Sequence, residues 1–263
     1  MSVRAAGTTR PRNAASAGFT GFPPQALRFL RAIARHNEKP WFEAHRADYE
    51  ETVKTPLAAL VEEMDARLGR LAPEMVGDRK RSVFRIHRDV RFSKDKSPYK
   101  THVACWFFHR DVRTGATRDA GGGEGTAAAV HGSAGFYYHL QPGQSLCGGG
   151  IWMPPRPALV RIRARIAERP EEWASLVDAP AFRRRFGALD EEAMLTRVPR
   201  GFAAEHPAAR WLRFQSFTAG HALGDEEATA ATLPDQLERS FTALLPVVRW
   251  LNAALGLRAA DRR

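Results

Sequence analysis

The sequence predicts an α+β fold, in which flanking helices cover an antiparallel sheet of four or more strands. Helical periodicity occupies both ends of the chain, and a block with the alternating pattern of β-strands lies between them. Apolar residues make up 44% of the 263 residues and include six tryptophans, which is enough for a core. Because helical and strand segments are separate along the chain, we expect an antiparallel sheet in a single domain.

Three stretches are expected to lie outside the ordered part of this domain. Residues 1–17 are polar and rich in Ala, residues 113–134 are mostly Gly, Ala and Thr, and residues 257–263 carry three arginines. Such stretches bury too few large apolar groups to offset the entropy of ordering. We therefore predict a disordered leader at 1–17, one domain at 18–256 with a flexible insertion at 113–134, and a disordered tail at 257–263.

The first third of the domain has the pattern of helices. Pro23 and Pro24 suit the first turn of a helix that ends near Asn37. A second helix is predicted to open at Pro40. Thr55 and Pro56 resemble the N-cap and the first position of a third helix. Its apolar stripe consists of Leu57, Leu60, Val61, Met64 and Leu68.

The middle of the domain has the pattern of strands. From Val83 to Phe92 the apolar period is two, which predicts a half-buried strand with Arg88 pointing inward. A turn with Pro98 leads to a second predicted strand at 101–109. Residues 135–141 and 145–152 flank a Gly-containing loop and so predict a hairpin. Together these segments form a predicted four-stranded meander.

Helical periodicity returns after Pro154. It is carried first by Leu159, Ile162 and Ile166, then by short segments around Trp173 and Phe182. A last helix contains Pro246, which is expected to kink it. Its apolar positions are Leu237, Phe241, Leu244, Val248, Leu251 and Leu255.

Charge and cysteine content limit the function classes. The net charge is +11, of which residues 1–12 contribute +3 and residues 257–263 contribute +2, while residues 70–100 hold ten basic side chains against four acidic ones. Cys105 and Cys147 have neither a disulfide framework nor zinc-type spacing. Without a long apolar run or a secretory pattern at the start, we expect a cytoplasmic protein that does not bind a membrane.

The densest group of cations lies between Arg85 and Lys100. Half of the six lysines are in its second part, Lys94, Lys96 and Lys100, although arginine supplies 34 of the 40 basic residues of the chain. Arginine offers a planar fork and lysine a mobile point charge, and together they suit a phosphate or carboxylate. The predicted ligand-binding residues are Arg85, Asp89, Arg91, Lys94, Lys96 and Tyr99.

Within this group the roles are expected to differ. No catalytic residue is assigned from the sequence, and the candidates are Asp89, Lys96 and Tyr99. Arg88 is expected to be structural, since a buried guanidinium needs a carboxylate or several backbone carbonyls as partners. An alternating exposed face is also typical of solvated ion pairs of little energetic value, and this interpretation stays open.

The same segment resembles a known family. Its residues Arg85, Arg88, Asp89, Arg91, Phe92, Asp95, Lys96 and Tyr99 resemble the signature of the bacterial and fungal family catalogued as domain of unknown function 2461. The resemblance extends from about Phe19 to Leu251 and includes Asn37, Trp41 and Phe42. It implies a single fold and a focal site, but it supplies no substrate and no cofactor.

Three functions are compatible with these patterns. The first is binding of a phosphate-bearing or other anionic small ligand, with or without turnover, at the Arg, Asp, Lys and Tyr cluster. The second is a nucleic-acid-binding module that uses the same basic surface, and the third is a scaffold for a protein partner. His87, His102, His109 and His139 lie on predicted strands, where lone histidines are usually structural, so we assign no metal site.

Overall fold

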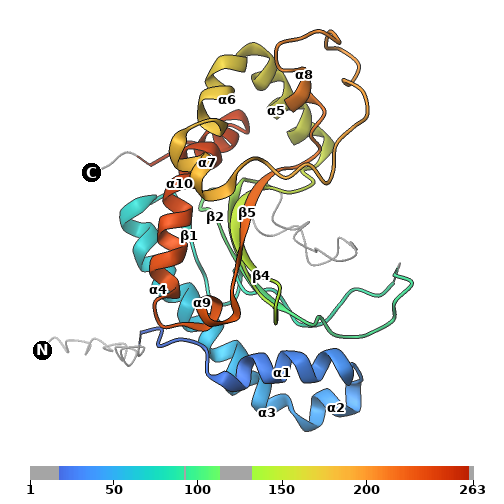
Figure 1. Cartoon of the computed structure of the whole chain (residues 1–263), viewed down its shortest axis with the longest axis vertical. Helices are drawn as coiled ribbons and strands as arrows, with labels where there is room; N and C mark the ends of the chain where they lie inside the picture. The colour runs from blue at the N-terminus through green and yellow to red at the C-terminus, as the bar shows by residue number, and fades with distance from the viewer. Residues whose placement is uncertain (1–17, 92, 113–131, 261–263) are drawn as a thin grey trace, which may run out of the picture.

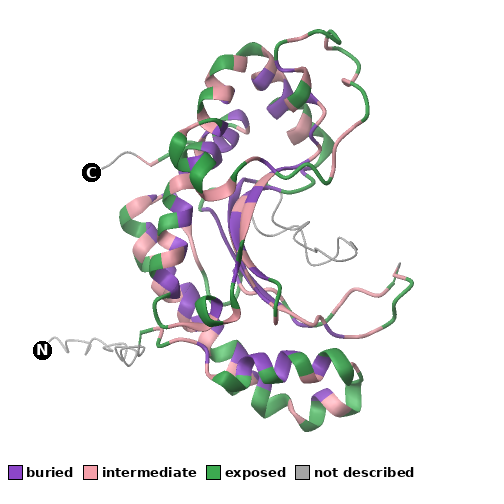
Figure 2. Cartoon of the chain, viewed as in Figure 1, coloured by how far each residue is buried: buried purple, intermediate pink, exposed green. Residues whose placement is uncertain are grey.

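The structure confirms the α+β class. The computed structural model describes residues 18–91, 93–112 and 132–260. Among these residues a central antiparallel sheet of five strands is flanked by helices (Figure 1). Most of the buried apolar residues form one cluster that includes the sheet and helices from both halves of the chain. Figure 2 shows that burial is densest on the strands and on the helix faces turned toward them.

The strands follow one another in space in their sequence order. They are β1 (Met75–Val76), β2 (Val103–His109), β3 (Gly135–Leu140), β4 (Ser145–Ile151) and β5 (Phe217–Leu223). The predicted second strand and the predicted hairpin correspond to β2, β3 and β4, with Tyr138 opposite Cys147 in the register. β5 pairs with β4 along its whole length, and Cys147 lies opposite His221. The short edge strand β1 and the strand β5 were not predicted from the sequence.

Helices α4 (Thr55–Leu71) and α10 (Leu233–Ala254) lie against one face of the sheet (Figure 1). The ring of Phe136 on β3 stacks on Phe241 of α10, with centroids 4.5 Å apart. Side chains alternate along a strand, so Tyr137 and His139 project from the opposite face. Tyr138, which shares the helix-facing side with Phe136, is buried and its hydroxyl donates to the carbonyl of Ala228.

The helices before the sheet confirm the predicted pattern with one correction. α1 (Pro24–Arg35), α2 (Lys39–Ala44) and α3 (Arg46–Tyr49) are followed by a π-helical turn at Glu50–Lys54 that runs directly into α4. Thr55 was predicted to cap a new helix, which is wrong. Its amide donates to the carbonyl of Glu50, five residues back, and this wider turn lets the helix continue although Pro56 has no N–H to donate.

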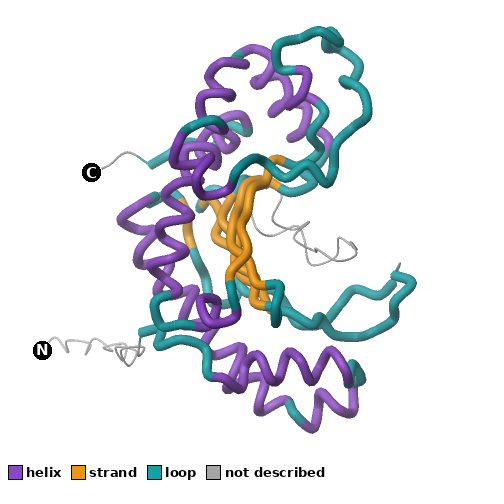
Figure 3. Tube along the Cα trace, viewed as in Figure 1, coloured by secondary structure: helices purple, strands orange, loops and turns teal. Residues whose placement is uncertain are grey.

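The helices between β4 and β5 gather at the other end of the sheet from α1, α2 and α3 (Figure 3). They are α5 (Arg156–Glu168), α6 (Pro170–Val177), α7 (Pro180–Phe186) and α8 (Ala209–Leu212), and α9 (Asp225–Thr229) follows β5. The final helix α10 continues through Pro246. No helix in the described ranges combines the length and the apolar character required to cross a bilayer.

The strand predicted at 83–92 is not a regular strand. Residues 83–91 are mostly irregular and carry only isolated bridges, between Val83 and Cys105 and between His87 and Tyr99, and Phe92 lies outside the described residues. The alternation was partly informative, because Ile86 is buried while Arg85 and His87 are exposed. Between the two bridges this segment advances by four residues, from 83 to 87, whereas the segment paired with it advances by six, from 99 to 105. The two extra residues interrupt the regular pairing.

The stretches predicted to be disordered fall mainly outside the described residues. The leader at 1–17 does so entirely, as do 113–131 of the insertion and 261–263 of the tail. The described ends of these stretches contact the domain. Ala134 exchanges two hydrogen bonds with the Asn252 side chain, and the carbonyl of Arg258 lies 2.8 Å from Nε2 of His109.

Candidate functional site

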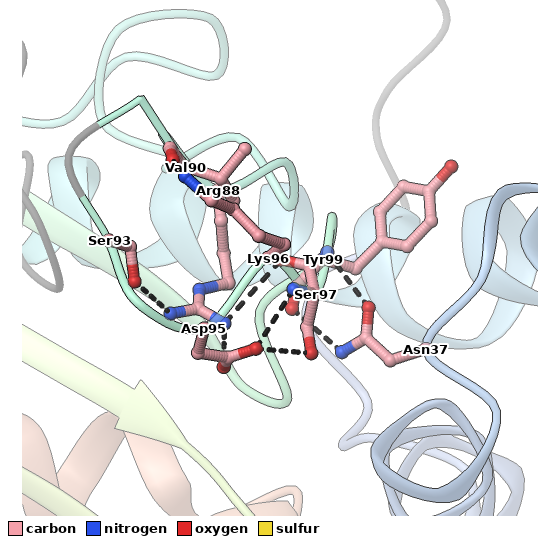
Figure 4. A network of polar contacts seen from close by, with 8 residues as sticks. All are labelled: Asn37, Arg88, Val90, Ser93, Asp95, Lys96, Ser97 and Tyr99. Carbon is pink, nitrogen blue, oxygen red and sulfur yellow. Dashed lines mark hydrogen bonds and ion pairs between the residues drawn. The ribbon is translucent and has the colours of Figure 1, made fainter.

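Residues 83–100 form an irregular hairpin, which we call the basic arm, beside α1 and α2 (Figure 1). Its two sides are joined by backbone hydrogen bonds from Arg88 to Pro98, 2.9 Å, and from Lys100 to Ile86, 2.8 Å. The Asn37 side chain accepts from the amide of Tyr99 and donates to its carbonyl, both at 2.9 Å (Figure 4). This pair of bonds fixes the base of the arm against the loop between α1 and α2.

Arg88 has the partners that the sequence argument required. Its guanidinium pairs with the carboxylate of Asp95, and the carbonyl of Ser97 and the hydroxyl of Ser93 lie 3.4 Å from its nitrogens (Figure 4). The Arg88 side chain is only 14% exposed. Hydrogen bonds from Ser97, followed by Arg88, lower the pKa of Asp95 to about 2. This pair holds the tip of the arm together, a geometry that suits the structural role proposed for Arg88.

Asp89 is engaged by its neighbour Arg91. Nε of Arg91 lies 3.0 Å and Nη2 lies 2.8 Å from the two carboxylate oxygens, and the Asp89 side chain is 7% exposed. The side-chain and backbone hydrogen bonds from Arg91 lower the pKa of Asp89 to about 2. A carboxylate held this strongly in its charged form is a poor general acid or base near neutral pH.

The remaining predicted residues do not meet at one point. Lys96 donates to the carbonyl of Val90 at 2.9 Å. The ring of Tyr99 is buried and stacks on Phe42, with centroids 4.3 Å apart, and its hydroxyl points away from Asp95 and Lys96 (Figure 4). Arg85 and Lys94 are exposed and have no hydrogen bond or ion pair with another described residue.

Lys100 lies in a different environment from the other lysines of the arm. It is half-buried, and its ammonium lies 5.5 Å from the ring centroid of Phe84. No described residue forms a hydrogen bond or an ion pair with this ammonium. Burial, followed by the charge of Arg85, lowers the pKa of Lys100 to about 8. Phe84 in turn contacts Tyr137, so Lys100 lies on the sheet face turned away from α10.

Two histidines on the same face are coupled to Lys100. The rings of His102 and His139 stack with centroids 4.3 Å apart. Burial lowers the pKa of His102 to about 3, with further lowering by His139, Lys100 and Arg88. Burial and Lys100 also lower the pKa of His139. Both imidazoles are therefore neutral at physiological pH.

Hydrogen bonds define the state of His139. Its Nδ1 lies 3.1 Å from the hydroxyl of Tyr137, and its Nε2 lies 2.9 Å from Oε1 of Gln141. In the tautomer with a proton on Nε2, the ring donates to Gln141 and accepts from Tyr137. The His102 side chain has no hydrogen bond to another described residue.

We call Arg85, Lys100, His102 and His139 the Lys100 cluster. The causes of the pKa shifts of its lysine and two histidines include Arg85, Arg88 and one another, but no carboxylate. Lys100 belongs to the lysine group seen in the sequence but not to the predicted site residues, and the histidines were expected to be structural. The signal that could have identified them is their position on one side of neighbouring strands, at 102 and 139.

No group of three or more His, Cys, Asp or Glu side chains arranged to hold a metal ion occurs in the described part of the chain. The Lys100 cluster in particular combines only two imidazoles with two cations, and cations repel a metal ion. The chemistry that this donor set supports best is attraction of an anion.

Comparison with known proteins adds the family. Neither a curated protein nor a solved structure matches the chain. The sequence model of the family described as "Conserved hypothetical protein (DUF2461)" matches residues 25–250, which is most of the described chain and includes the basic arm and the sheet. The protein therefore belongs to this family, as the signature between Arg85 and Tyr99 indicated.

Proposed function

We propose that the protein binds a small anionic ligand, a compound with a phosphate or carboxylate group, at the Lys100 cluster. The observation that supports this most is the half-buried Lys100 ammonium, which lies near Arg85 and has no carboxylate partner among the described residues. Two like charges near a partly desolvated site are unfavourable, and a bound anion relieves both the repulsion and the desolvation. The ligand then supplies the counter-charge that the protein lacks there.

The rest of the predicted set contributes to this proposal in other ways. Asp89 pairs with Arg91, and Arg88 pairs with Asp95. The two charges within each pair neutralise each other, and the pairs shape the arm. Lys94 and Lys96 are exposed on the same arm as Arg85 and Lys100 and add positive potential to it, which raises the rate at which an anion arrives at low salt. Of the ligand-binding residues predicted from the sequence, Arg85 is the one that we propose contacts the anion.

Calorimetric titration with sulfate tests the proposal, because sulfate stays fully ionised from pH 6 to pH 10. We expect binding at pH 7 that weakens at least tenfold in Arg85→Ser and is unchanged in Lys80→Ser, which removes an exposed lysine outside the arm. Binding should also weaken as the pH rises through about 8, because Lys100 then loses its charge. The variant Lys100→Arg keeps its charge and should remove this pH dependence.

Equal sulfate affinity in the wild type and in Arg85→Ser would contradict the proposal. So would a protein that ignores sulfate but binds a long single-stranded oligonucleotide with a steep salt dependence, since that result favours the nucleic-acid alternative suggested by the net charge.

A further inference from the structure

We propose that Lys100 is a nucleophilic amine that forms an imine with a small oxo acid, an aldehyde or ketone that also carries a carboxylate or phosphate group. The inference rests on the proposed function, because Arg85 is the group that holds the anionic end of this ligand. It goes further by assigning covalent chemistry to Lys100 and a carbonyl group to the ligand.

The surroundings of Lys100 are those that an amine nucleophile requires. A lysine attacks a carbonyl only when it is neutral, and burial or a neighbouring cation favours the neutral form. Lys100 has both features, since it is half-buried over the ring of Phe84 and lies near Arg85. With its pKa at about 8, a pH of 7.5 leaves about 200-fold more neutral amine than in a lysine with the ordinary pKa.

Two other described lysines have contacts that keep the proton in place. The ammonium of Lys54 lies 2.7 Å from the carboxylate of Glu50, and the ammonium of Lys96 donates to the carbonyl of Val90. Lys100 has no such acceptor among the described residues, and its polar neighbours besides Arg85 are imidazoles. His139 is held neutral between Tyr137 and Gln141, so it offers no negative charge to stabilise an ammonium.

The proposed reaction needs no co-reactant. The lone pair of the Lys100 nitrogen forms a bond to the carbonyl carbon, and proton transfer from nitrogen to oxygen gives a carbinolamine. The hydroxyl group of this intermediate takes up a proton and leaves as water, which produces a protonated imine. One amine, one carbonyl compound and one proton thus give one iminium ion and one water, and hydrolysis reverses each step. The imine also withdraws electrons from the adjacent carbon of the ligand, the usual basis of imine catalysis.

Reductive trapping tests this inference on the full chain. The protein is incubated with glyoxylate and cyanoborohydride at pH 7.5, and peptide mapping by mass spectrometry locates carboxymethylated amines. We expect Lys100 to be modified at least tenfold faster than Lys80, an exposed lysine outside the basic arm. The rate should increase as the pH rises from 6.5 to 8.5, and sulfate should slow it by competing for Arg85.

The controls separate this inference from the proposed function. Lys100→Arg must lose the adduct, and Arg85→Ser must trap glyoxylate at least fivefold more slowly with its thermal unfolding unchanged. Sulfate binding together with modification of Lys100 no faster than of Lys80 overturns the imine inference and leaves anion binding standing. Fast trapping at Lys100 that sulfate does not slow overturns the proposed anion site instead.

Discussion

At the scale of single residues, pairing decides which of the clustered cations can act on a ligand. The arm from residue 83 to 100 contains six basic and two acidic side chains. Each carboxylate forms an ion pair with one arginine, Asp89 with Arg91 and Asp95 with Arg88. The sequence predicted that Arg88 needs a carboxylate or several backbone carbonyls, because an inward guanidinium is costly alone. It did not predict which aspartate, since the pairing depends on how the tip of the arm folds back.

The pair of Asp89 and Arg91 makes stability depend on acid pH. The pKa of Asp89 is about 2 in the folded protein, below the value of about 3.9 in an unfolded chain. The stabilisation is therefore complete above pH 4 and is lost as the pH falls through about 2. We expect Asp89→Asn to unfold at a lower temperature than the wild type at pH 6, and the difference to close at pH 2.

Thermal unfolding monitored by circular dichroism at a series of pH values measures this difference. Asp178→Asn is the matched control, because Asp178 is exposed and its side chain has no hydrogen bond or ion pair with a described residue. A gap between Asp89→Asn and the wild type that stays constant from pH 6 to pH 2 would show that the carboxylate is not held by Arg91.

At the scale of elements, the basic arm shows what a periodic pattern can and cannot predict. The alternation correctly placed Ile86 inside and Arg85 outside, and it correctly paired this segment with the next one. It failed to predict the irregular backbone, because the two extra residues near Thr101 change the register without altering the pattern of 83–91. β5 was missed because its sequence of Thr, Ala, Gly and His gives little strand signal, and pairing with β4 determines its structure.

The Asn37 side chain is predicted to fix the arm. It makes two hydrogen bonds to the backbone of Tyr99, and each is worth about 1 kcal/mol. Asn37→Ala should therefore lower the free energy of unfolding by about 2 kcal/mol. Hydrogen exchange of the amides in residues 83–100 should accelerate more than that of the sheet amides. Glu38→Ala changes the adjacent exposed residue and should alter neither quantity.

An increase in exchange spread equally over β2, β3 and the arm would contradict this role of Asn37. In that case its substitution destabilises the whole domain and does not release the arm selectively.

At the scale of the whole molecule, the sheet is held between a helical face and a face that carries polar groups. The family resemblance and the separation of helices from strands were enough to predict this architecture. The convergence of Lys100, His102 and His139 was not predictable in the same way. It depends on the register in which Ala104 lies opposite His139, which a single sequence does not specify.

The ion pair of Glu74 and Arg249 connects distant parts of the chain. The Glu74 side chain is 2% exposed and accepts from Nε of Arg249 on α10 at 2.7 Å. Arg249→Met leaves this carboxylate buried, with only the backbone amide of Ala260, 3.3 Å away, still donating to it among the described residues. The free energy of unfolding should therefore fall by about 3 kcal/mol.

Urea unfolding measures this cost. Arg239→Met, which removes an exposed arginine of the same helix, should change the free energy of unfolding by less than about 0.5 kcal/mol. Equal effects of the two substitutions would show that the buried pair does not link α10 to the edge of the sheet.

The most direct test of the anion site is an NMR titration of the Lys100 side chain in the free protein and with sulfate. The account predicts a pKa near 8 in the free protein and a higher pKa when sulfate is bound, because the anion stabilises the ammonium. An ordinary lysine pKa in the free protein, or a pKa that sulfate leaves unchanged, would contradict it.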